Sequence, residues 1–351
     1  MIESQLLLEK IRTESITWED FSKILTLDSE DLIEFFNLTQ EITRRNFNNT
    51  LKIYIPTVRF PAISITGSEC ALECEHCNKK YLKGMKYITE NKELEQFLNQ
   101  LAKNGGVGAL ISGGNTIDGF VPLYEFLGAI KKVKRDTNLI INTHTGLLNE
   151  ETAKKLAEAN VDIVSFDINM DEDIVQNIYH LDIDLIQYKR AIDLLKKYKL
   201  NIVPHICIGL NYGRIKKEIE SIKFIKENII DPHLIVVIVL IPPEDAKKKF
   251  ELPKPSDVAK IITILRLVFP STEISLGCMR PRGKIKTEIE KAAIKAGITR
   301  IEIPSKETLK WLKKYNSKIQ FKFYSACCAI PNKFEKLAES KKSDIKRYIN
   351  V

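Results

Sequence analysis

The stretch Ser68-Glu-Cys-Ala-Leu-Glu-Cys-Glu-His-Cys77 places three cysteines in a C-x3-C-x2-C pattern, just after the apolar run Ala62–Thr66. Three thiolates this close in sequence can bind three irons of a [4Fe–4S] cluster and leave the fourth iron without a protein ligand. Zinc is the alternative, but it prefers four ligands, usually supplied as two pairs. Because the sequence holds no second C-x2-C pair, the pattern favours a cluster with one open iron at the end of a strand.

Around this stretch, short apolar runs alternate with amphipathic segments that are rich in lysine and glutamate. We expect eight strands, at residues 62–66, 109–112, 139–143, 162–167, 202–208, 234–240, 273–276 and 300–303. The helical candidates between them are residues 94–103, 121–135, 152–159, 185–198, 216–228, 257–268 and 287–296. Strand-then-helix units require parallel pairing through right-handed crossovers. Eight units predict an α/β fold, a (βα)8 TIM-type barrel, with a doubly wound open sheet as the alternative.

The pattern divides the chain into three parts: an N-terminal helical segment (residues 1–55), the barrel (56–305) and a C-terminal extension (306–351). In the first part Leu32, Phe35, Phe36 and Ile42 recur at helical spacing, and Asp28 is a candidate N-cap. A chain of 351 residues that is 44% hydrophobic has ample material for one barrel.

Composition and charge indicate where such a protein works. The N-terminus is polar, and the longest apolar run, residues 234–241, is too short to span a bilayer, so we expect a cytoplasmic protein without a membrane partner. Seven cysteines, three of them clustered, then indicate metal binding and not disulfides. The net charge of +8 is scattered and lacks an aromatic–basic motif, so we expect no nucleic-acid binding. A basic surface would suit an acidic partner protein.

Residues that can carry chemistry follow the ends of the predicted strands. They are Ser112 to Asn115, Thr143 to Gly146, Asp167 and Asn169, Gly209 to Gly213, and Gly277-Cys278. In a βα barrel the carboxyl ends of all strands meet at one rim, where active sites are built. The sequence therefore predicts a single site that includes the cysteine triplet.

The triplet after a first strand, followed by Gly113-Gly114 after the second, resembles the radical S-adenosylmethionine superfamily. In that family the open iron chelates S-adenosylmethionine, and one electron cleaves its sulfonium bond to give a 5′-deoxyadenosyl radical that abstracts hydrogen from carbon. The resemblance implies a [4Fe–4S] cluster on Cys70, Cys74 and Cys77. It also implies S-adenosyl-L-methionine as the second cofactor and a ferredoxin-like electron donor.

The resemblance also assigns residues to S-adenosylmethionine: His76, Gly113, Gly114, Asn115, Asp167, Ile208 and Gly209. His76 holds the place where the family often has an aromatic residue against the adenine. The paired glycines allow close approach to the methionine amino group, and Asn115 stands where an acidic residue is usual. Asp167 matches the position that holds the ribose, and Ile208-Gly209 the motif that faces the adenine. Taken alone, Asp167 would be an ordinary loop carboxylate and Gly113-Gly114 an ordinary turn.

Four further cysteines remain: Cys207, Cys278, Cys327 and Cys328. Strand alternation puts His205, Cys207 and Gly209 on one face. We expect these cysteines to bind an auxiliary [4Fe–4S] cluster, with Cys207 and Cys278 acting in catalysis and one of the adjacent pair as a spare. The alternative is that they are small apolar core residues. His144 is expected either as a substrate-side catalytic group or as a hydrogen-bonded core histidine.

Within the superfamily, residues 40 to 305 resemble biotin synthase, including Pro204 to Gly209 and Leu276 to Gly283. Biotin synthase has cysteines near the ends of its second and third strands, where this chain has Ser112 and Asn142 to His144. The pattern is most similar to archaeal-type two-component lipoyl synthase subunits. That likeness implies a sulfurtransferase that inserts sulfur into an octanoyl chain on a lysine of the lipoyl carrier protein, with a sister radical enzyme as partner.

Two alternatives stay open. The first is another biotin-synthase-like enzyme, such as a biotin synthase, a rearrangement enzyme or a cofactor maturase, that has no sacrificial cluster. The second is an electron carrier or a structural iron–sulfur protein, which would not cleave S-adenosylmethionine and would leave Gly113-Gly114 and Asp167 unexplained.

Overall fold

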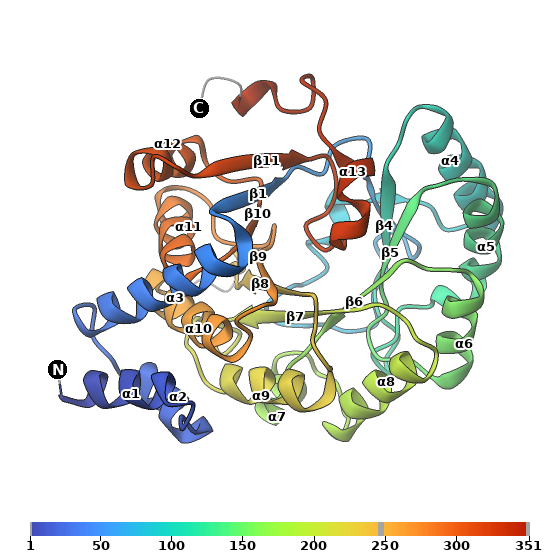
Figure 1. The fold of residues 1–351 in the computed structure, drawn as a ribbon. Helices are drawn as coiled ribbons and strands as arrows, with labels where there is room; N and C mark the ends of the chain where they lie inside the picture. Colours follow the sequence, from blue (N-terminus) through green and yellow to red (C-terminus); the bar gives the residue numbers. More distant parts are fainter. Residues whose placement is uncertain (1, 245–248, 349–351) are drawn as a thin grey trace. The chain divides into compact units, whose positions relative to one another are not determined.

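The computed structural model describes residues 2–244 and 249–348 (Figure 1). The described residues fall into two compact units. The first comprises the chain up to Ile53, residues 206–322 and Arg347 onward. The second comprises Tyr54–His205 and Phe323–Lys346. Among the described helices, none combines the length and the apolar character that a membrane crossing requires.

The second unit is built on parallel strands. Their hydrogen-bonded order is β3 (Lys86–Tyr87), β2 (Ala62–Ser64), β4 (Gly108–Ser112), β5 (Ile140–His144), β6 (Ile163–Asp167) and β7 (Ile202–Ile208), which continues into the first unit. The helices that connect them are α4 (Asn91–Lys103), α5 (Leu127–Asp136), α6 (Glu150–Glu158), α7 (Glu172–Asn177) and α8 (Ile186–Lys197). In Figure 1, α4 and α5 lie along one side of β4 and β5. The C-terminal chain adds α13 (Glu335–Ala338) to this unit.

Local sequence explains these helices. In α4, Leu94, Leu98 and Leu101 recur at helical spacing and are all buried. At the start of α6, the Asn149 side chain accepts a hydrogen bond from the Thr152 N–H, which satisfies one of the open donors of the first turn.

The strands of the second unit have one apolar and one polar face. The register pairs Ser64 with Ser112, His144 with Ser165, and Asp167 with His205. Since neighbouring residues in a parallel pair point to the same side, these polar side chains share a face, and the alternating residues such as Ile63 and Phe166 point to the other. Ser64, Ser165 and His205 are nevertheless buried. The polar face therefore places side chains that can bind a ligand or exchange a proton inside the fold.

The first unit repeats the parallel pattern. Strands β8 (Leu234–Val239), β9 (Glu273–Leu276) and β10 (Arg300–Glu302) pair in parallel, and β1 (Thr50–Tyr54) lies next to β10. Strand β11 is Gln320–Tyr324. The helices are α1 (Ile2–Arg12), α2 (Trp18–Ile24), α3 (Asp31–Phe47), α9 (Glu218–Asn228), α10 (Pro255–Val268), α11 (Lys284–Ala296) and α12 (Lys306–Tyr315).

Helix α3 caps the carboxyl end of α11. The Gln40 side-chain amide donates to the carbonyls of Ile294 (2.5 Å) and Lys295 (3.1 Å). Those carbonyls belong to the last turn of α11, where backbone donors become scarce; the Ile294 carbonyl also accepts the Gly297 N–H at 3.1 Å. The N-terminal helices are therefore fixed to this unit by polar contacts as well as by their apolar faces.

The parallel α/β class predicted from the sequence is confirmed, and each of the eight predicted strand runs contains a strand, β2 or one of β4 to β10. A barrel and an open doubly wound sheet both bring the carboxyl ends of their parallel strands to one edge. The choice between them therefore does not change which residues can form the site. The predicted part boundaries at residues 55/56 and 305/306 stay a prediction.

Candidate cluster and cofactor site

The cysteine triplet lies on the loop that follows β2. Cys70, Cys74 and Cys77 are each half-buried. The N–H groups of Cys77 (3.0 Å) and Asn78 (2.9 Å) both donate to the Cys74 carbonyl, which closes a tight turn. This turn holds the second and third cysteines on one compact loop.

A second loop, after β4, is bonded to the first. The Asn115 N–H donates to the Cys70 Sγ at 3.3 Å, and the Ala71 N–H donates to the Asn115 carbonyl at 2.8 Å. The Gly114 N–H donates to the Thr66 Oγ1 at 2.7 Å. The predicted residues Gly113, Gly114 and Asn115 thus lie against the cysteine loop, and a backbone amide already serves a cysteine sulfur.

Gly114 is required by this contact. A Cβ at this position would lie 2.0 Å from the Glu69 carbonyl oxygen and 2.5 Å from the Cys70 Cβ. At Gly113 a Cβ would meet Thr66 at 3.0 Å, which is tight but not impossible. The close approach that the sequence assigned to the glycine pair therefore depends mainly on its second member.

The thiol set fits an iron–sulfur cluster. Burial raises the pKa of Cys74 to about 12, and the neighbouring Cys77 and Cys70 add to that rise. Three mutually repelling thiolates are therefore stable together only with a compensating cation. Among the residues that the structure describes, the three sulfurs do not all lie within 4.8 Å of one another. A single zinc ion needs closer sulfurs, because its Zn–S bonds are about 2.3 Å long, whereas a cluster binds each thiolate at a different iron.

His76 and Tyr179 lie beside the triplet. Their ring centroids are 5.3 Å apart. Burial, helped by the charge of Lys80, lowers the pKa of His76 to about 4, so this imidazole is neutral at pH 7. Within residues 2–244 and 249–348, no group is within hydrogen-bonding distance of the buried His76 Nδ1. A flat, neutral ring with an unused polar atom is suited to a heteroaromatic ligand.

The ends of β5, β6 and β7 bring two histidines to one carboxylate. The His144 Nδ1 lies 3.6 Å from the Asp167 Oδ2, and the His144 and His205 rings meet edge to face at 5.1 Å. Burial lowers the pKa of His205 to about 4, and its Nδ1–H donates to the Val203 carbonyl at 2.9 Å.

Asp167 remains ionised in this setting. Desolvation by the surrounding strand ends raises its pKa, but the hydrogen bond and charge of His144 outweigh it and hold the pKa below its ordinary value. The Asp167 side chain is still 62% exposed. An exposed, ionised carboxylate can accept two hydroxyl hydrogen bonds, which is the chemistry of a ribose contact.

The second unit therefore brings together most of the predicted site: the cysteine triplet, His76, the β4 loop residues, His144 and Asp167. Sequence reasoning missed Tyr179 and Thr66. Tyr179 lies 102 positions after Cys77 and carries no motif, so no sequence signal pointed to it.

The other predicted residues are divided between the units. Ile208 is buried in the first unit. There too, the Gly209 N–H donates to the Glu218 Oε1 at 2.9 Å, and Gly209 has a φ of 85°. Their roles toward S-adenosylmethionine stay predictions.

The four remaining cysteines differ in exposure. Cys207 is half-buried and Cys278 exposed in the first unit. In the second, Cys328 is 2% exposed, whereas Cys327 is half-buried with its Sγ 4.0 Å from the Asn142 Nδ2. An auxiliary cluster on these cysteines stays a prediction.

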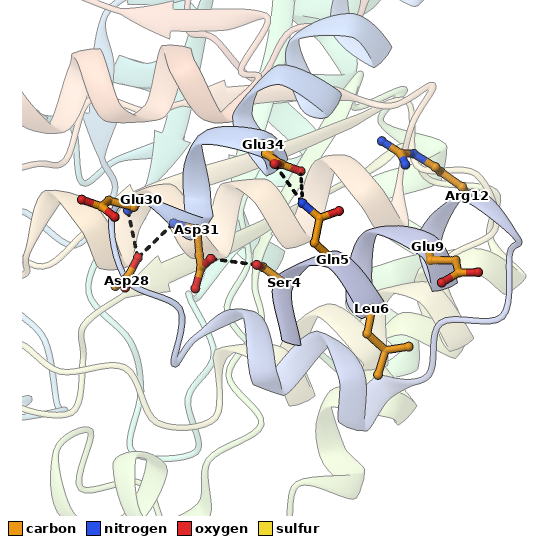
Figure 2. Close-up of a pocket in the computed structure, with 9 residues that line it drawn as sticks. All are labelled: Ser4, Gln5, Leu6, Glu9, Arg12, Asp28, Glu30, Asp31 and Glu34. Atoms are coloured by element: carbon orange, nitrogen blue, oxygen red, sulfur yellow. Dashed lines mark hydrogen bonds between the residues drawn. The ribbon is translucent and has the colours of Figure 1, made fainter. Parts of the chain in front are cut away.

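A large hollow in the first unit is a separate feature (Figure 2). It has a volume of about 870 Å³, lies between α1 and α3, and has an acidic lining. Its polar groups bond to one another: Ser4 donates to Asp31 (2.7 Å) and Gln5 to Glu34 (3.0 Å). None of the predicted site residues lines it.

Known proteins are similar to this chain in sequence. Residues 64–225 match the family model described as the Radical SAM superfamily. Biotin synthase from Bacillus cytotoxicus is 26% identical over 283 residues, which covers 78% of this chain and 80% of the relative. Biotin synthase from Bacillus cereus is 24% identical with the same coverage.

Solved structures of similar fold cover nearly the whole chain. Methylornithine synthase superposes with a TM-score of 0.62 at 18% identity, over 97% of this chain and 95% of that one. The FeFe-hydrogenase maturase HydG from Carboxydothermus hydrogenoformans gives a TM-score of 0.65 at 13% identity, over 95% and 81%. Over residues 64–225 the chain is therefore similar to the Radical SAM superfamily, over most of its length it is similar to biotin synthases, and it shares the parallel α/β fold of the two solved structures.

Proposed function

We propose that this chain is a radical S-adenosylmethionine enzyme that inserts sulfur into an unactivated C–H bond, as a lipoyl synthase subunit acting on a protein-bound octanoyl-lysine. The observation that carries the radical-enzyme part is the junction of the two loops. The Asn115 N–H reaches the Cys70 sulfur, and Gly114 packs against Cys70 where no side chain fits.

The residues of this chain would divide the work as follows. Cys70, Cys74 and Cys77 would hold the [4Fe–4S] cluster, and the Asn115 N–H would stabilise the Cys70 thiolate. Asp167 would accept the ribose hydroxyls, while His76 would form a wall for the adenine. When bound, the cluster and S-adenosylmethionine supply the radical that abstracts hydrogen; the protein binds, orients and excludes water.

The sulfur-donating part of the proposal rests on the remaining cysteines. Cys207, Cys278, Cys327 and Cys328 would hold an auxiliary [4Fe–4S] cluster that is consumed as the sulfur source. The substrate would be octanoyl-lysine on the lipoyl carrier protein, the electrons would come from a ferredoxin-like donor, and a sister radical enzyme would act on the second carbon. The net charge of +8 is compatible with an acidic carrier.

A second candidate is a biotin-synthase-like enzyme without a sacrificial cluster. The names methylornithine synthase and maturase support this candidate, whereas the name biotin synthase does not separate the two candidates, because biotin itself contains sulfur. The two candidates share the radical-generating site and differ in the fate of sulfur.

Anaerobic reconstitution with iron and sulfide separates them. We expect about eight irons per chain in the parent and about four in a Cys207→Ala/Cys278→Ala variant, because each [4Fe–4S] unit holds four. Incubation with an octanoyl-lysine peptide should then give a product whose mass includes added sulfur. A parent with about four irons, or a product without sulfur, would favour the second candidate.

A further inference from the structure

The chain that follows α7 is bonded to the cysteine loop. The Glu75 N–H donates to the Ile178 carbonyl at 2.9 Å, and the Cys74 Sγ lies 3.5 Å from the Tyr179 carbonyl oxygen. The Tyr179 ring then packs beside His76. Backbone and side chain of this segment thus both hold the loop on which Cys74 and His76 sit.

The far end of the Tyr179 side chain contacts a different loop. Its hydroxyl accepts a hydrogen bond from the Asn169 Nδ2 at 3.3 Å. Asn169 is 7% exposed, and its Oδ1 accepts the Asp171 N–H at 3.0 Å, so its amide is held in place. Asn169 follows Asp167 by two residues on the loop after β6. One side chain therefore links the His76 loop to the Asp167 loop.

From these contacts we infer that Tyr179 is a positioning residue: it fixes the spacing between His76 and Asp167 so that one nucleoside can contact both. The inference rests on the proposed function, in which these residues hold the adenine and the ribose. A nucleoside is rigid, so two loops that move independently must lose that freedom when it binds, whereas two linked loops have already lost it. The link should therefore appear as affinity for the adenosyl group.

The test removes the Tyr179 hydroxyl, which bonds Asn169, and measures binding. Tyr179→Phe keeps the ring beside His76 and deletes only the hydroxyl. We expect it to bind S-adenosylhomocysteine and S-adenosylmethionine roughly two- to tenfold more weakly than the parent, measured by calorimetry on reconstituted protein. The change in the electron paramagnetic resonance spectrum of the reduced cluster on adding S-adenosylmethionine should require correspondingly more ligand. Iron content and Tm should match the parent.

A double-mutant cycle and a matched control sharpen the result. Asn169→Ala removes the same bond from the other side, together with the bond from the Asp171 N–H, so the double variant should bind no more weakly than Asn169→Ala alone. Tyr198→Phe is the control, because the Tyr198 hydroxyl bonds Glu150 on the exposed surface. It should bind like the parent.

The outcomes distinguish the inference from the proposal beneath it. A parent that binds S-adenosylmethionine, with a Tyr179→Phe variant that binds equally well, overturns the inference alone. Weaker binding accompanied by lost iron or a lowered Tm assigns Tyr179 a structural role and overturns it as well. If the effects of Tyr179→Phe and Asn169→Ala on binding were additive, the hydrogen bond between these two residues would not be what links the His76 loop to the Asp167 loop. A reconstituted parent that binds neither ligand overturns the proposed function together with the inference.

Discussion

At the scale of single residues, the site depends on a glycine, Gly114, at a position where the folded loops leave no room for a side chain. Gly114 lies so close to Glu69 and Cys70 that the β4 loop and the cysteine loop meet backbone to backbone. The sequence predicted this role for the Gly113-Gly114 pair but could not rank its members, because the ranking depends on what each Cβ would meet. Only the folded loops supply that information.

Gly114→Ala should therefore separate the two loops. A methyl group 2.0 Å from the Glu69 carbonyl must displace backbone, so we expect a loss of about 1–3 kcal/mol in the free energy of unfolding and a marked loss of reconstituted iron. Urea unfolding and iron analysis provide the measurements. Gly128→Ala is the control: a Cβ added to Gly128 in α5 would meet nothing within 4 Å, and alanine favours a helix. Parent-like iron in Gly114→Ala would contradict the close-approach argument.

Asp167 provides a second residue-scale prediction. Asp167→Asn keeps the shape of the side chain but replaces one oxygen and removes its charge, so the side chain accepts hydroxyl hydrogen bonds less well. We expect weaker S-adenosylmethionine binding, by roughly ten- to a hundredfold if two charge-assisted bonds are lost, with iron content unchanged. Calorimetry and iron analysis check this. Unchanged affinity would remove Asp167 from the ribose role.

At the scale of elements, a buried charge network joins the strands of the first unit. The Glu273 carboxylate on β9 contacts Arg300 on β10 at 2.7 Å and Lys52 on β1 at 2.6 Å. Arg300 is fully buried. Burial alone would raise the pKa of Glu273, but the charges of Arg300 and Lys52 lower it to about 2. Charge pairing therefore contributes to the order of these strands alongside apolar packing.

This network predicts an acid-sensitive unit. Because the pKa of Glu273 is lowered on folding, its stabilisation is fully present above its ordinary pKa of 4.5 and is lost as the pH falls from 4.5 toward 2. Glu273→Gln should unfold about 3–5 kcal/mol more easily at pH 7, because it removes the carboxylate charge that faces the buried Arg300. The gap to the parent should narrow below pH 4.5 in urea titrations. A gap that stays constant down to pH 2 would contradict the assignment.

The control for this network is a pair on the surface. Glu251 contacts Arg214 at 2.9 Å, but their side chains are 61% and 70% exposed. Exposed ion pairs contribute little to stability. Glu251→Gln should therefore unfold like the parent at every pH. A loss comparable to that of Glu273→Gln would indicate a general charge effect.

Another buried cation shows how burial decides a role. Arg280 lies on the loop that follows β9. The structure buries it at 3% exposure, where it pairs with Glu290 at 2.7 Å and donates to the Glu302 carbonyl at 2.6 Å. Its guanidinium is committed to holding α11 and β10 in the first unit.

At the scale of the whole molecule, the sequence predicted the parallel α/β fold because short runs rich in apolar residues alternate with amphipathic helical segments. Among the described residues, the missed strands are β1, β3 and β11: β1 lies inside the segment expected to be helical although Leu51 and Ile53 are buried, whereas β3 and β11 lack an apolar run. Both residues of β3 are exposed, and β11 alternates lysine with aromatic residues. Such edge strands are defined by their neighbours and not by their own composition.

The candidate site, like the fold, contains some residues that the sequence could predict and others that it could not. The cysteine triplet, His76 and Asp167 could be predicted because each stands in or beside a local motif. Tyr179 could not, since its contacts with the cysteine loop join residues about one hundred positions apart and exist only once the fold is assembled. Whether Cys207 and Cys278 share a cluster with the tail cysteines depends likewise on long-range geometry and remains a prediction.

The most direct measurement is cleavage of S-adenosylmethionine by the reconstituted, dithionite-reduced protein, with the product 5′-deoxyadenosine measured by chromatography. The account predicts 5′-deoxyadenosine from the parent and none from a Cys74→Ala variant that is still folded by circular dichroism. A reduced parent with about four or more irons that yields no 5′-deoxyadenosine would contradict the account, as would equal cleavage by Cys74→Ala.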